Sequence, residues 1–261
     1  MNLSLQNKNA IVCGSTQGIG KAIAIELALL GANVTLLARN ESSLAESVKD
    51  LDVSKNQHHN ILVADFSKPE ELKNIIAKHC TTHTYHILVN NSGGPTSGAI
   101  TDEATDKFLQ IFNQHLICNQ IMAQAVLGGM KAEKYGRIIN VISTSVKQPL
   151  KNLGVSNTIR GAVASWAKTW SFEVAKFGIT VNNVLPGATA TNRLKTLIEN
   201  KSSKTNVEIT EVENEMINEI PAGRFGDPSE IAALAAFLAS PAAGYINGCS
   251  IPVDGGRTAA I

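Results

Sequence analysis

The sequence has few of the features that mark specialised classes of protein. Aromatic residues make up 5% and charged residues 17% of its 261 positions, against 44% hydrophobic residues, which is typical of a globular protein. No run of about 18 apolar residues occurs, so we expect no segment that crosses a membrane. The first residues, MNLSLQNKNA, lack the apolar centre of a secretory signal peptide.

Net charge and cysteine are also scarce. The formal net charge is +1, which creates no field that would recruit nucleic acid or an anionic membrane surface. The cysteines, Cys13, Cys80, Cys118 and Cys249, are too scattered for a metal site. We therefore expect no metal, no disulfide, no nucleic acid, no membrane partner and a reduced, cytoplasmic protein.

Short apolar runs alternate with amphipathic stretches along the whole chain. Runs typical of strands occupy residues 9–14, 33–39, 59–67, 86–94, 136–143, 179–187 and 249–256. Helical patterns lie between them, including 18–32, 69–80, 102–132, 156–177 and 228–240. Apolar strands separated by helices predict a doubly wound α/β fold, with a seven-stranded parallel sheet covered by helices on both faces.

The length and the absence of a linker or repeat indicate a single domain over residues 1–261. Residues 192–220 differ from the rest, because they are polar, rich in Asn, Lys and Glu, and weakly periodic. We expect a substrate flap at about 190–220 beside the site; a mobile surface segment is the alternative.

A glycine-rich turn follows the first apolar run. The stretch GSTQGIG places Gly14, Gly18 and Gly20 where a strand passes into a helix. Glycines allow a tight turn and a close approach of a ligand, and a helix N-terminus favours a pyrophosphate. The turn predicts a dinucleotide site, although a glycine-rich turn can also be merely structural.

The second strand run ends in LLARN, with Ala38 followed by Arg39. An acidic residue there would accept hydrogen bonds from a ribose 2′-hydroxyl and favour NAD(H). A guanidinium pairs instead with a 2′-phosphate, so Arg39 favours NADP(H) over NAD(H). The alternative is a surface arginine that binds nothing.

Several motifs in the same order resemble those of the short-chain dehydrogenase/reductase family. They are GSTQGIG, ADFS, NNSGG, GRIINVIS, PGATAT and YINGCSIPVDGG. Among subgroups, the chain looks nearest to the 3-oxoacyl-[acyl-carrier-protein] reductases. The resemblance implies a Rossmann-type fold, an NADP(H)-dependent oxidoreductase, a small-molecule or acyl-thioester substrate, and a homotetramer or homodimer.

The resemblance also implies a set of cofactor contacts. Asp65 would border the adenine, and Thr191 would contact the nicotinamide carboxamide. The full set is Gly14, Ser15, Thr16, Gln17, Gly18, Ile19, Arg39, Asp65, Phe66, Asn91, Ser92, Gly93, Arg160, Pro186, Gly187, Thr189 and Thr191.

The catalytic groups of the family are a Ser, a Tyr, a Lys and an Asn, and only the first has an identical counterpart here. Ser143 matches the Ser. By the spacing of the family, Ser156 stands where the Tyr is expected, Arg160 where the Lys is expected, and His115 where the Asn is expected. Tyr85, Tyr135 and Tyr245 lie outside the catalytic motif.

These replacements have different chemical consequences. Arg160 keeps the positive charge but cannot relay a proton. Ser156 can hold a water where the phenol would lie, or simply cap the helix. His115 can act as an acid or a relay, or be a satisfied core or interface histidine. Lys147 and Lys151 are further proton donors or binding groups for an anionic substrate, or plain solvated surface.

Three functions remain open at this point. The first is an NADP(H)-dependent reductase of a 3-oxoacyl-type carbonyl or other small ketone, with an atypical proton donor. The second is a catalytically impaired NADP(H)-binding sensor or partner subunit. The third is dehydration or isomerisation with His115 as the base.

An apolar stripe marks the helical pattern at 156–177. Its members are Val163, Trp166, Ala167, Trp170 and Val174. The stripe fits an oligomer interface, or a face that packs on the sheet.

Overall fold

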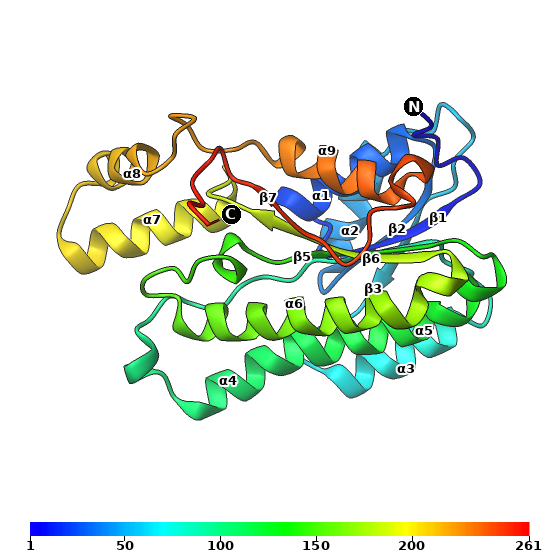
Figure 1. The fold of residues 1–261 in the computed structure, drawn as a ribbon, viewed down its shortest axis with the longest axis horizontal. Helices are drawn as coiled ribbons and strands as arrows, with labels where there is room; N and C mark the ends of the chain where they lie inside the picture. Colours follow the sequence, from blue (N-terminus) through cyan, green and yellow to red (C-terminus); the bar gives the residue numbers. More distant parts are fainter. Residues whose placement is uncertain (261) are drawn as a thin grey trace.

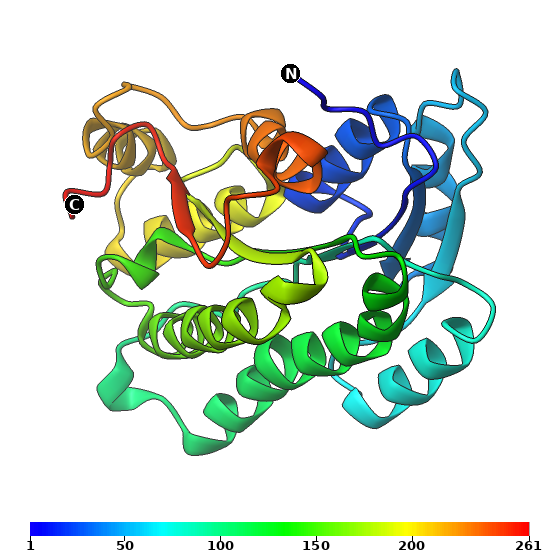
Figure 2. The same cartoon turned by 45° about the vertical axis from the view of Figure 1, so that its right-hand side comes forward.

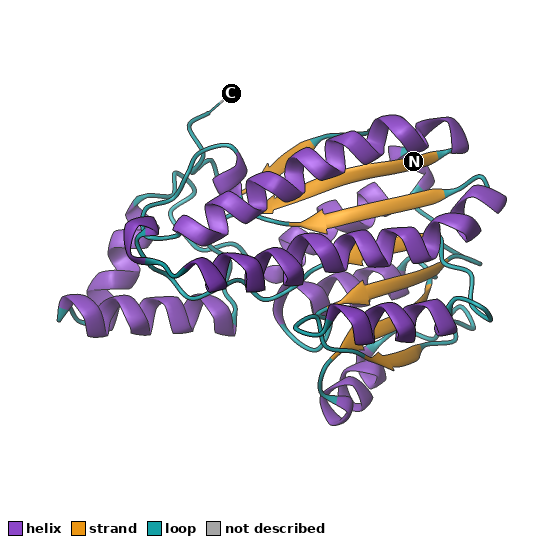
Figure 3. Cartoon of the chain, turned by 90° about the horizontal axis from the view of Figure 1, so that it is seen from below, coloured by secondary structure: helices purple, strands orange, loops and turns teal. Residues whose placement is uncertain are grey.

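The structure, a computed structural model, describes residues 1–260. Its centre is a seven-stranded parallel sheet in the order β3-β2-β1-β4-β5-β6-β7, and Figure 3 shows the arrows pointing the same way. The strands are β1 (Asn9–Cys13), β2 (Asn33–Ala38), β3 (Asn60–Val63), β4 (Ile87–Asn90), β5 (Gly136–Val141), β6 (Ile179–Pro186) and β7 (Ser250–Val253). The predicted seven-stranded, doubly wound sheet is confirmed.

Helices cover both faces of this sheet (Figure 1). On one face lie α1 (Gly18–Leu29), α2 (Glu41–Ser47) and α9 (Pro228–Ala239). On the other lie α3 (Pro69–His79), α4 (Thr105–Phe112), α5 (Cys118–Ala132) and α6 (Gly154–Val174). The two layers explain why the inner strands are apolar, since neither of their faces meets solvent, whereas the edge strands β3 and β7 are partly exposed.

Strand β1 shows how one strand serves two cores. Ala10 and Val12 belong to the core beneath α1 and α9. Ile11 and Cys13 belong to the core beneath α3, α5 and α6. Successive side chains of a strand point to opposite faces, so this run of buried residues packs against both helix layers.

The strand order reverses direction beside β1, which pairs with β2 on one side and β4 on the other. In open parallel sheets, ligands bind outside the carboxyl ends of the strands at such a point. The fold therefore places the glycine turn after β1 and the loop after β4 beside one crevice.

Within the predicted helical pattern at 102–132, the backbone is helical without a break from residue 105 to 132. It is divided into α4 and α5 by a π-helical turn at Asn113–Ile117. This turn carries His115 and has five residues in the wider π geometry, which occurs frequently at functional sites. A bulge of this kind leaves the apolar periodicity nearly intact, so the sequence did not reveal it.

The polar segment 192–220 forms two helices, α7 (Asn192–Thr205) and α8 (Ile209–Asn218). Figures 1 and 2 show them at one end of the molecule, beyond the sheet. They pack on each other around a small apolar cluster, Leu194, Ile198 and Val212, that is separate from the two main cores. We call residues 192–220 the flap.

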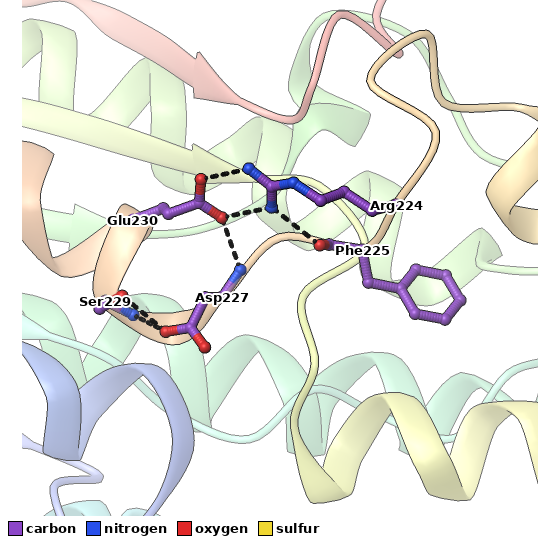
Figure 4. A network of polar contacts seen from close by, with 5 residues as sticks. All are labelled: Arg224, Phe225, Asp227, Ser229 and Glu230. Atoms are coloured by element: carbon purple, nitrogen blue, oxygen red, sulfur yellow. Dashed lines mark hydrogen bonds and ion pairs between the residues drawn. The ribbon is translucent and has the colours of Figure 1, made fainter.

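The flap leaves the domain through a narrow neck formed by residues 188–190 and 224–227. Thr189 and Gly226 form an isolated parallel β-bridge that links the two segments of the neck. Asp227 and Glu230 make a capping box at the start of α9, and Arg224 binds both oxygens of Glu230 at 2.7 Å (Figure 4). The neck fixes where the flap begins and ends.

The apolar stripe of α6 packs inside the chain. Val163, Ala167 and Val174 are buried. The indole nitrogens of Trp166 and Trp170 both donate to the side-chain oxygen Oε1 of Gln120 in α5, at 2.7 and 3.0 Å. The stripe thus packs on the sheet and on α5, and an oligomer interface on α6 stays a prediction. Although α6 has 21 residues, no helix within residues 1–260 is long and apolar enough to cross a membrane.

Candidate active site

One large cavity, with a volume of about 1350 Å³, opens at the carboxyl edge of the sheet. Its walls come from the segments after β1 to β6 and from the flap. It brings together most of the predicted site residues: Gly14, Thr16, Gln17, Gly18, Ile19, Arg39, Asp65, Phe66, Asn91, Ser92, Gly93, Ser143, Ser156, Arg160, Pro186, Gly187, Thr189 and Thr191. Two predicted residues, Ser15 and His115, are not among those that line it.

The glycine turn leaves no room for side chains. Gly14 and Gly18 have φ values of 60° and 54°, which favour glycine. A Cβ on Gly14 would lie 2.5 Å from the carbonyl oxygen of Asn91, and one on Gly20 would lie 2.2 Å from that of Gly14. The turn thus packs against the loop after β4 and keeps its backbone amides at the start of α1. Ser15 is buried, and its hydroxyl donates to Leu37.

Arg39 stands at the end of the cavity beyond β2. It lines the cavity and is exposed, and within residues 1–260 no carboxylate forms a salt bridge with it. Asp65 and Phe66, after β3, line the same end. One end of the cavity therefore presents a guanidinium that is free to pair with an anion.

The loop after β4 contacts the buried histidine of the π turn. The Ser92 hydroxyl lies 2.8 Å from Nδ1 of His115. His115 is 3% exposed, and its Nε2 has no hydrogen-bond partner among the described residues. Burial, with the Arg160 charge as a second cause, lowers the pKa of His115 to about 3. The imidazole is therefore neutral at neutral pH and is not a source of protons there.

Ser143 and Ser156 face the cavity from two elements. Ser143 follows β5, and its Oγ accepts a hydrogen bond from the amide of Ser145 at 3.1 Å. Ser156 lies in the first turn of α6, whose N-cap is Leu153, so the interpretation of Ser156 as a helix cap is wrong. The Ser156 hydroxyl is thus not needed to cap α6.

Arg160 lies one helical turn beyond Ser156 and is 8% exposed. Its Nη1 donates to the carbonyl of Val141 at the end of β5, at 2.9 Å. Burial and the nearby charge of Arg193 lower its pKa to about 10, so it remains a cation at neutral pH. The hydrogen bond to β5 fixes the guanidinium at the inner wall of the cavity.

The segment after β6 closes the cavity over the glycine turn. Thr191 is the N-cap of α7, and its hydroxyl accepts from the amide of Leu194 at 3.3 Å. A Cβ on Gly18 would lie 3.2 Å from the Thr191 methyl group. Thr191 is therefore held beside the start of α1.

The candidate proton donors separate in the structure. Lys151 lines the cavity, whereas Lys147 does not. Within residues 1–260, no tyrosine lines it either. Tyr85 and Tyr135 are bonded elsewhere, to Thr35 and to the Ala239 carbonyl.

The structure also adds a residue that the sequence analysis missed. Arg193, at the start of α7, lines the cavity opposite Arg160, and its guanidinium donates to the carbonyl of Pro95. The only sequence signal was its place two residues after Thr191, in a polar segment whose mixed charges by themselves indicate solvated surface. No group of metal-ligating side chains occurs within the described residues.

Comparison with known proteins identifies the family. The model of the family described as enoyl-(acyl carrier protein) reductase, adh_short_C2, matches residues 14–258. The chain belongs to the short-chain dehydrogenase/reductase family. Within this family it is 35% identical over 259 residues to the 3-oxoacyl-[acyl-carrier-protein] reductase FabG of Vibrio cholerae, covering 97% of this chain and 98% of that protein.

Two further members of the family are similar over their whole length. The NADPH-dependent reductase BacG of Bacillus subtilis is 31% identical over 260 residues, with 98% of this chain and all of that protein covered. The L-sorbose reductase of Gluconobacter frateurii, solved with NADPH and L-sorbose, is 28% identical with a TM-score of 0.92, and both chains are fully covered. Short-chain reductases with different carbonyl substrates thus share this fold.

Proposed function

We propose that this chain is an NADP(H)-dependent oxidoreductase that reduces a carbonyl, of 3-oxoacyl type or in another small ketone, by hydride transfer with an atypical proton donor. One observation carries the proposal: a single cavity joins the glycine turn, the unpaired Arg39 and Ser143. A dinucleotide needs the first two, and a reacting carbonyl needs the third.

The residues present fit this cofactor. A pyrophosphate needs a backbone that it can approach closely, and any Cβ at Gly14 or Gly20 would collide with neighbouring backbone. Arg39 offers a 2′-phosphate a free guanidinium. Arg160 and Thr191 would hold the nicotinamide end, and Asp65 would border the adenine. The cofactor, when bound, supplies the hydride.

The protein contributes hydrogen bonds and a proton. The Ser143 hydroxyl donates to the carbonyl oxygen and stabilises the charge that develops there. We infer that Ser156 and Arg160 occupy the positions of the Tyr and Lys of the family. The reduced oxygen then takes its proton from a water held by Ser143 and Ser156. Lys151, which lines the cavity, restores that proton from solvent.

The relatives support the cofactor and the reaction type. BacG is named an NADPH-dependent reductase, and the L-sorbose reductase was solved with NADPH. FabG is named a 3-oxoacyl reductase. These names concern those proteins, and this chain shares their fold and whole length.

The test is a fluorescence titration with NADPH, followed by NADPH oxidation with β-ketoacyl thioesters, diketones, oxo acids and quinones. We expect micromolar NADPH binding and turnover with at least one class. Absence of binding below millimolar NADPH would refute the proposal. Unchanged turnover in Lys151→Ala and Ser156→Ala would exclude the proposed proton path but would leave the reductase function standing.

The second candidate is a catalytically impaired NADP(H)-binding sensor or partner subunit. Two observations favour it: the cavity has no lining tyrosine within residues 1–260, and the His115 imidazole is neutral. Such a protein would bind NADPH without oxidising it in the presence of any carbonyl of the panel.

We also propose a cytoplasmic homotetramer or homodimer with one domain per chain and a flap that covers a small-molecule or acyl-thioester substrate. All four cysteines are free, as expected in a reducing compartment. On the outer side of α6, Phe172 is 72% exposed and is a candidate interface residue. Light scattering during gel filtration would measure the assembly.

A further inference from the structure

Two arginines from different elements meet beside Gly94, in the loop after β4. A Cβ on Gly94 would lie 3.6 Å from Nη2 of Arg160 and 3.6 Å from Nη2 of Arg193. Arg160 comes from α6 and Arg193 from α7, at the neck side of the flap. Any side chain longer than alanine would fill the space between the two guanidinium groups.

Neither arginine has a carboxylate partner within residues 1–260. Among the described residues, their side chains donate to the backbone carbonyls of Val141 and Pro95. Both face the same cavity. Three exposed lysines line it as well, Lys151, Lys201 and Lys204, of which Lys201 forms a salt bridge with Glu215.

Acidic residues are rare on the cavity wall. Those that line it are Asp65, which is at the adenine end, and Glu219, which forms a salt bridge with Arg257. The cavity around Gly94 therefore carries a positive charge that the described residues do not neutralise.

Two like charges this close repel each other, and burial increases the cost. Burial and, after it, the Arg193 charge lower the pKa of Arg160, and burial lowers the pKa of Arg193, yet both remain cations at neutral pH. Backbone carbonyls satisfy some of the N–H donors but supply no counter-charge. An anionic ligand between the arginines would provide that charge, and a guanidinium binds a carboxylate through two parallel hydrogen bonds.

We propose that Arg160 and Arg193 bind the free carboxylate of the substrate, so that the carbonyl reduced at Ser143 belongs to an oxo acid rather than to a neutral ketone or a thioester. This inference rests on the proposed reductase function and narrows its substrate class. Gly94 keeps the space for the carboxylate, and Arg193 makes the flap part of the substrate site.

Since Arg193 lies in the first turn of α7, a bound carboxylate would also contact the flap. A carboxylate held by both arginines joins the flap to α6, which belongs to the body of the domain. Arg160 would then serve both the substrate and the nicotinamide end, whereas Arg193 serves the substrate alone. Arg193 is therefore the residue to change.

The experiment compares an inert acid with its neutral amide, 4-phenylbutanoate against 4-phenylbutanamide, by calorimetric titration of the protein with and without NADP⁺. We expect the acid to bind at least about 10-fold more tightly, as hydrogen bonds to charged groups give. The preference should disappear in Arg193→Gln, persist in part in Arg193→Lys, and be unchanged in Lys195→Gln, a neighbouring lysine of α7 that does not line the cavity.

Equal affinity for acid and amide, or a preference that survives in Arg193→Gln, would overturn the proposal. Circular dichroism of each variant, compared with the wild type, verifies that the variants are folded. NADPH titration of the same samples tests the reductase function separately. If NADPH binds while acid and amide bind equally, only the carboxylate proposal fails; if NADPH does not bind, the reductase function fails.

Discussion

Ser92 Oγ lies 2.8 Å from Nδ1 of His115, and this contact joins the loop after β4 to the π turn between α4 and α5. The other ring nitrogen of His115 is buried and has no partner within the described residues. Burial disfavours the protonated ring, and the nearby charge of Arg160 disfavours it further, so the pKa of His115 is lowered to about 3. His115 thus serves as a neutral link in this loop rather than as an acid.

This lowered pKa makes stability depend on pH. Below its ordinary pKa of about 6.5, an unfolded histidine binds a proton that the folded His115 does not, so folding should lose about 1.4 kcal/mol per pH unit as the pH falls toward 3. We expect the loss between about pH 6.5 and pH 5 to be roughly 2 kcal/mol smaller in His115→Asn. Urea unfolding of both proteins measures it.

His79 and His86 also have lowered pKa values and add a loss of the same sign. They are present in both proteins, so the difference between wild type and variant reports His115 alone. Parallel pH curves for the two proteins would contradict a neutral, buried His115.

Arg39 should determine the choice between NADPH and NADH. Removing a guanidinium that pairs with a phosphate costs about 1.5–3 kcal/mol, which is roughly 10- to 150-fold in affinity. We expect Arg39→Ala to weaken NADPH binding by about this factor and to leave NADH binding nearly unchanged. Fluorescence titration with both cofactors measures this, with Lys49→Ala, on the surface outside the cavity, as the control. Equal weakening for both cofactors would show that Arg39 does not contact the 2′-phosphate.

Removal of the Ser143 hydroxyl should lower kcat and leave the affinity for NADPH unchanged. Loss of one hydrogen bond to a developing oxyanion lowers kcat by about 10²- to 10³-fold. We expect Ser143→Ala to show this loss with an unchanged Kd for NADPH. Ser145→Ala is the matched control, because Ser145 is buried next to Ser143 and does not line the cavity. Similar rates in Ser143→Ala and wild type would remove Ser143 from the chemistry.

The flap should open independently of the sheet. Ile198 is 3% exposed and packs with Leu194 and Val212, apart from the main cores. Truncation of a buried isoleucine to alanine typically costs about 2–5 kcal/mol. We expect Ile198→Ala to speed hydrogen exchange of amides in 192–220 while β4 and β5 stay protected. Faster exchange throughout the sheet would mean that the flap and the domain unfold together.

Much of the fold could be predicted because the inner strands of the sheet are buried on both faces. A run such as HILVNNSGG has no polar alternation, and the predicted strand contains β4 (Ile87–Asn90). The helix α2 was not predicted from the sequence, because it is only seven residues long. Its one local signal was the N-cap Asn40, whose Oδ1 accepts from the amide of Ser43 at 2.8 Å. Short helices carry little periodicity.

Residues 192–220 were singled out by their polar composition, but the helices α7 and α8 were not predicted, and the role of a substrate flap stays a prediction. Most residues of the flap are polar, and the few apolar ones form the cluster around Val212 only when α7 packs against α8. The sequence pattern of each helix alone was therefore too weak to predict it. The stripe on α6 shows the converse. Its apolar character was clear, but the sequence could not tell that Trp166 and Trp170 share one acceptor on α5.

In the site, the glycine turn and the other motifs could be recognised from the sequence, since each is a short continuous stretch. Contacts between distant segments could not. Arg160 and Arg193 meet at Gly94 only because α6 and the neck of the flap converge on the loop after β4. The same limit applies to Lys147 and Lys151, which are equally basic in sequence, whereas only Lys151 faces the cavity.

The most direct test of the reductase function is the transfer of deuterium from cofactor to product. The protein is incubated with NADPH deuterated at C4 on the transferred face and with the carbonyl panel, and the products are analysed by mass spectrometry. Reduction by this chain predicts an alcohol that carries one deuterium at the former carbonyl carbon, in amounts equal to the NADPH consumed. Tight NADPH binding without any deuterated alcohol, for every carbonyl class including oxo acids, would contradict it.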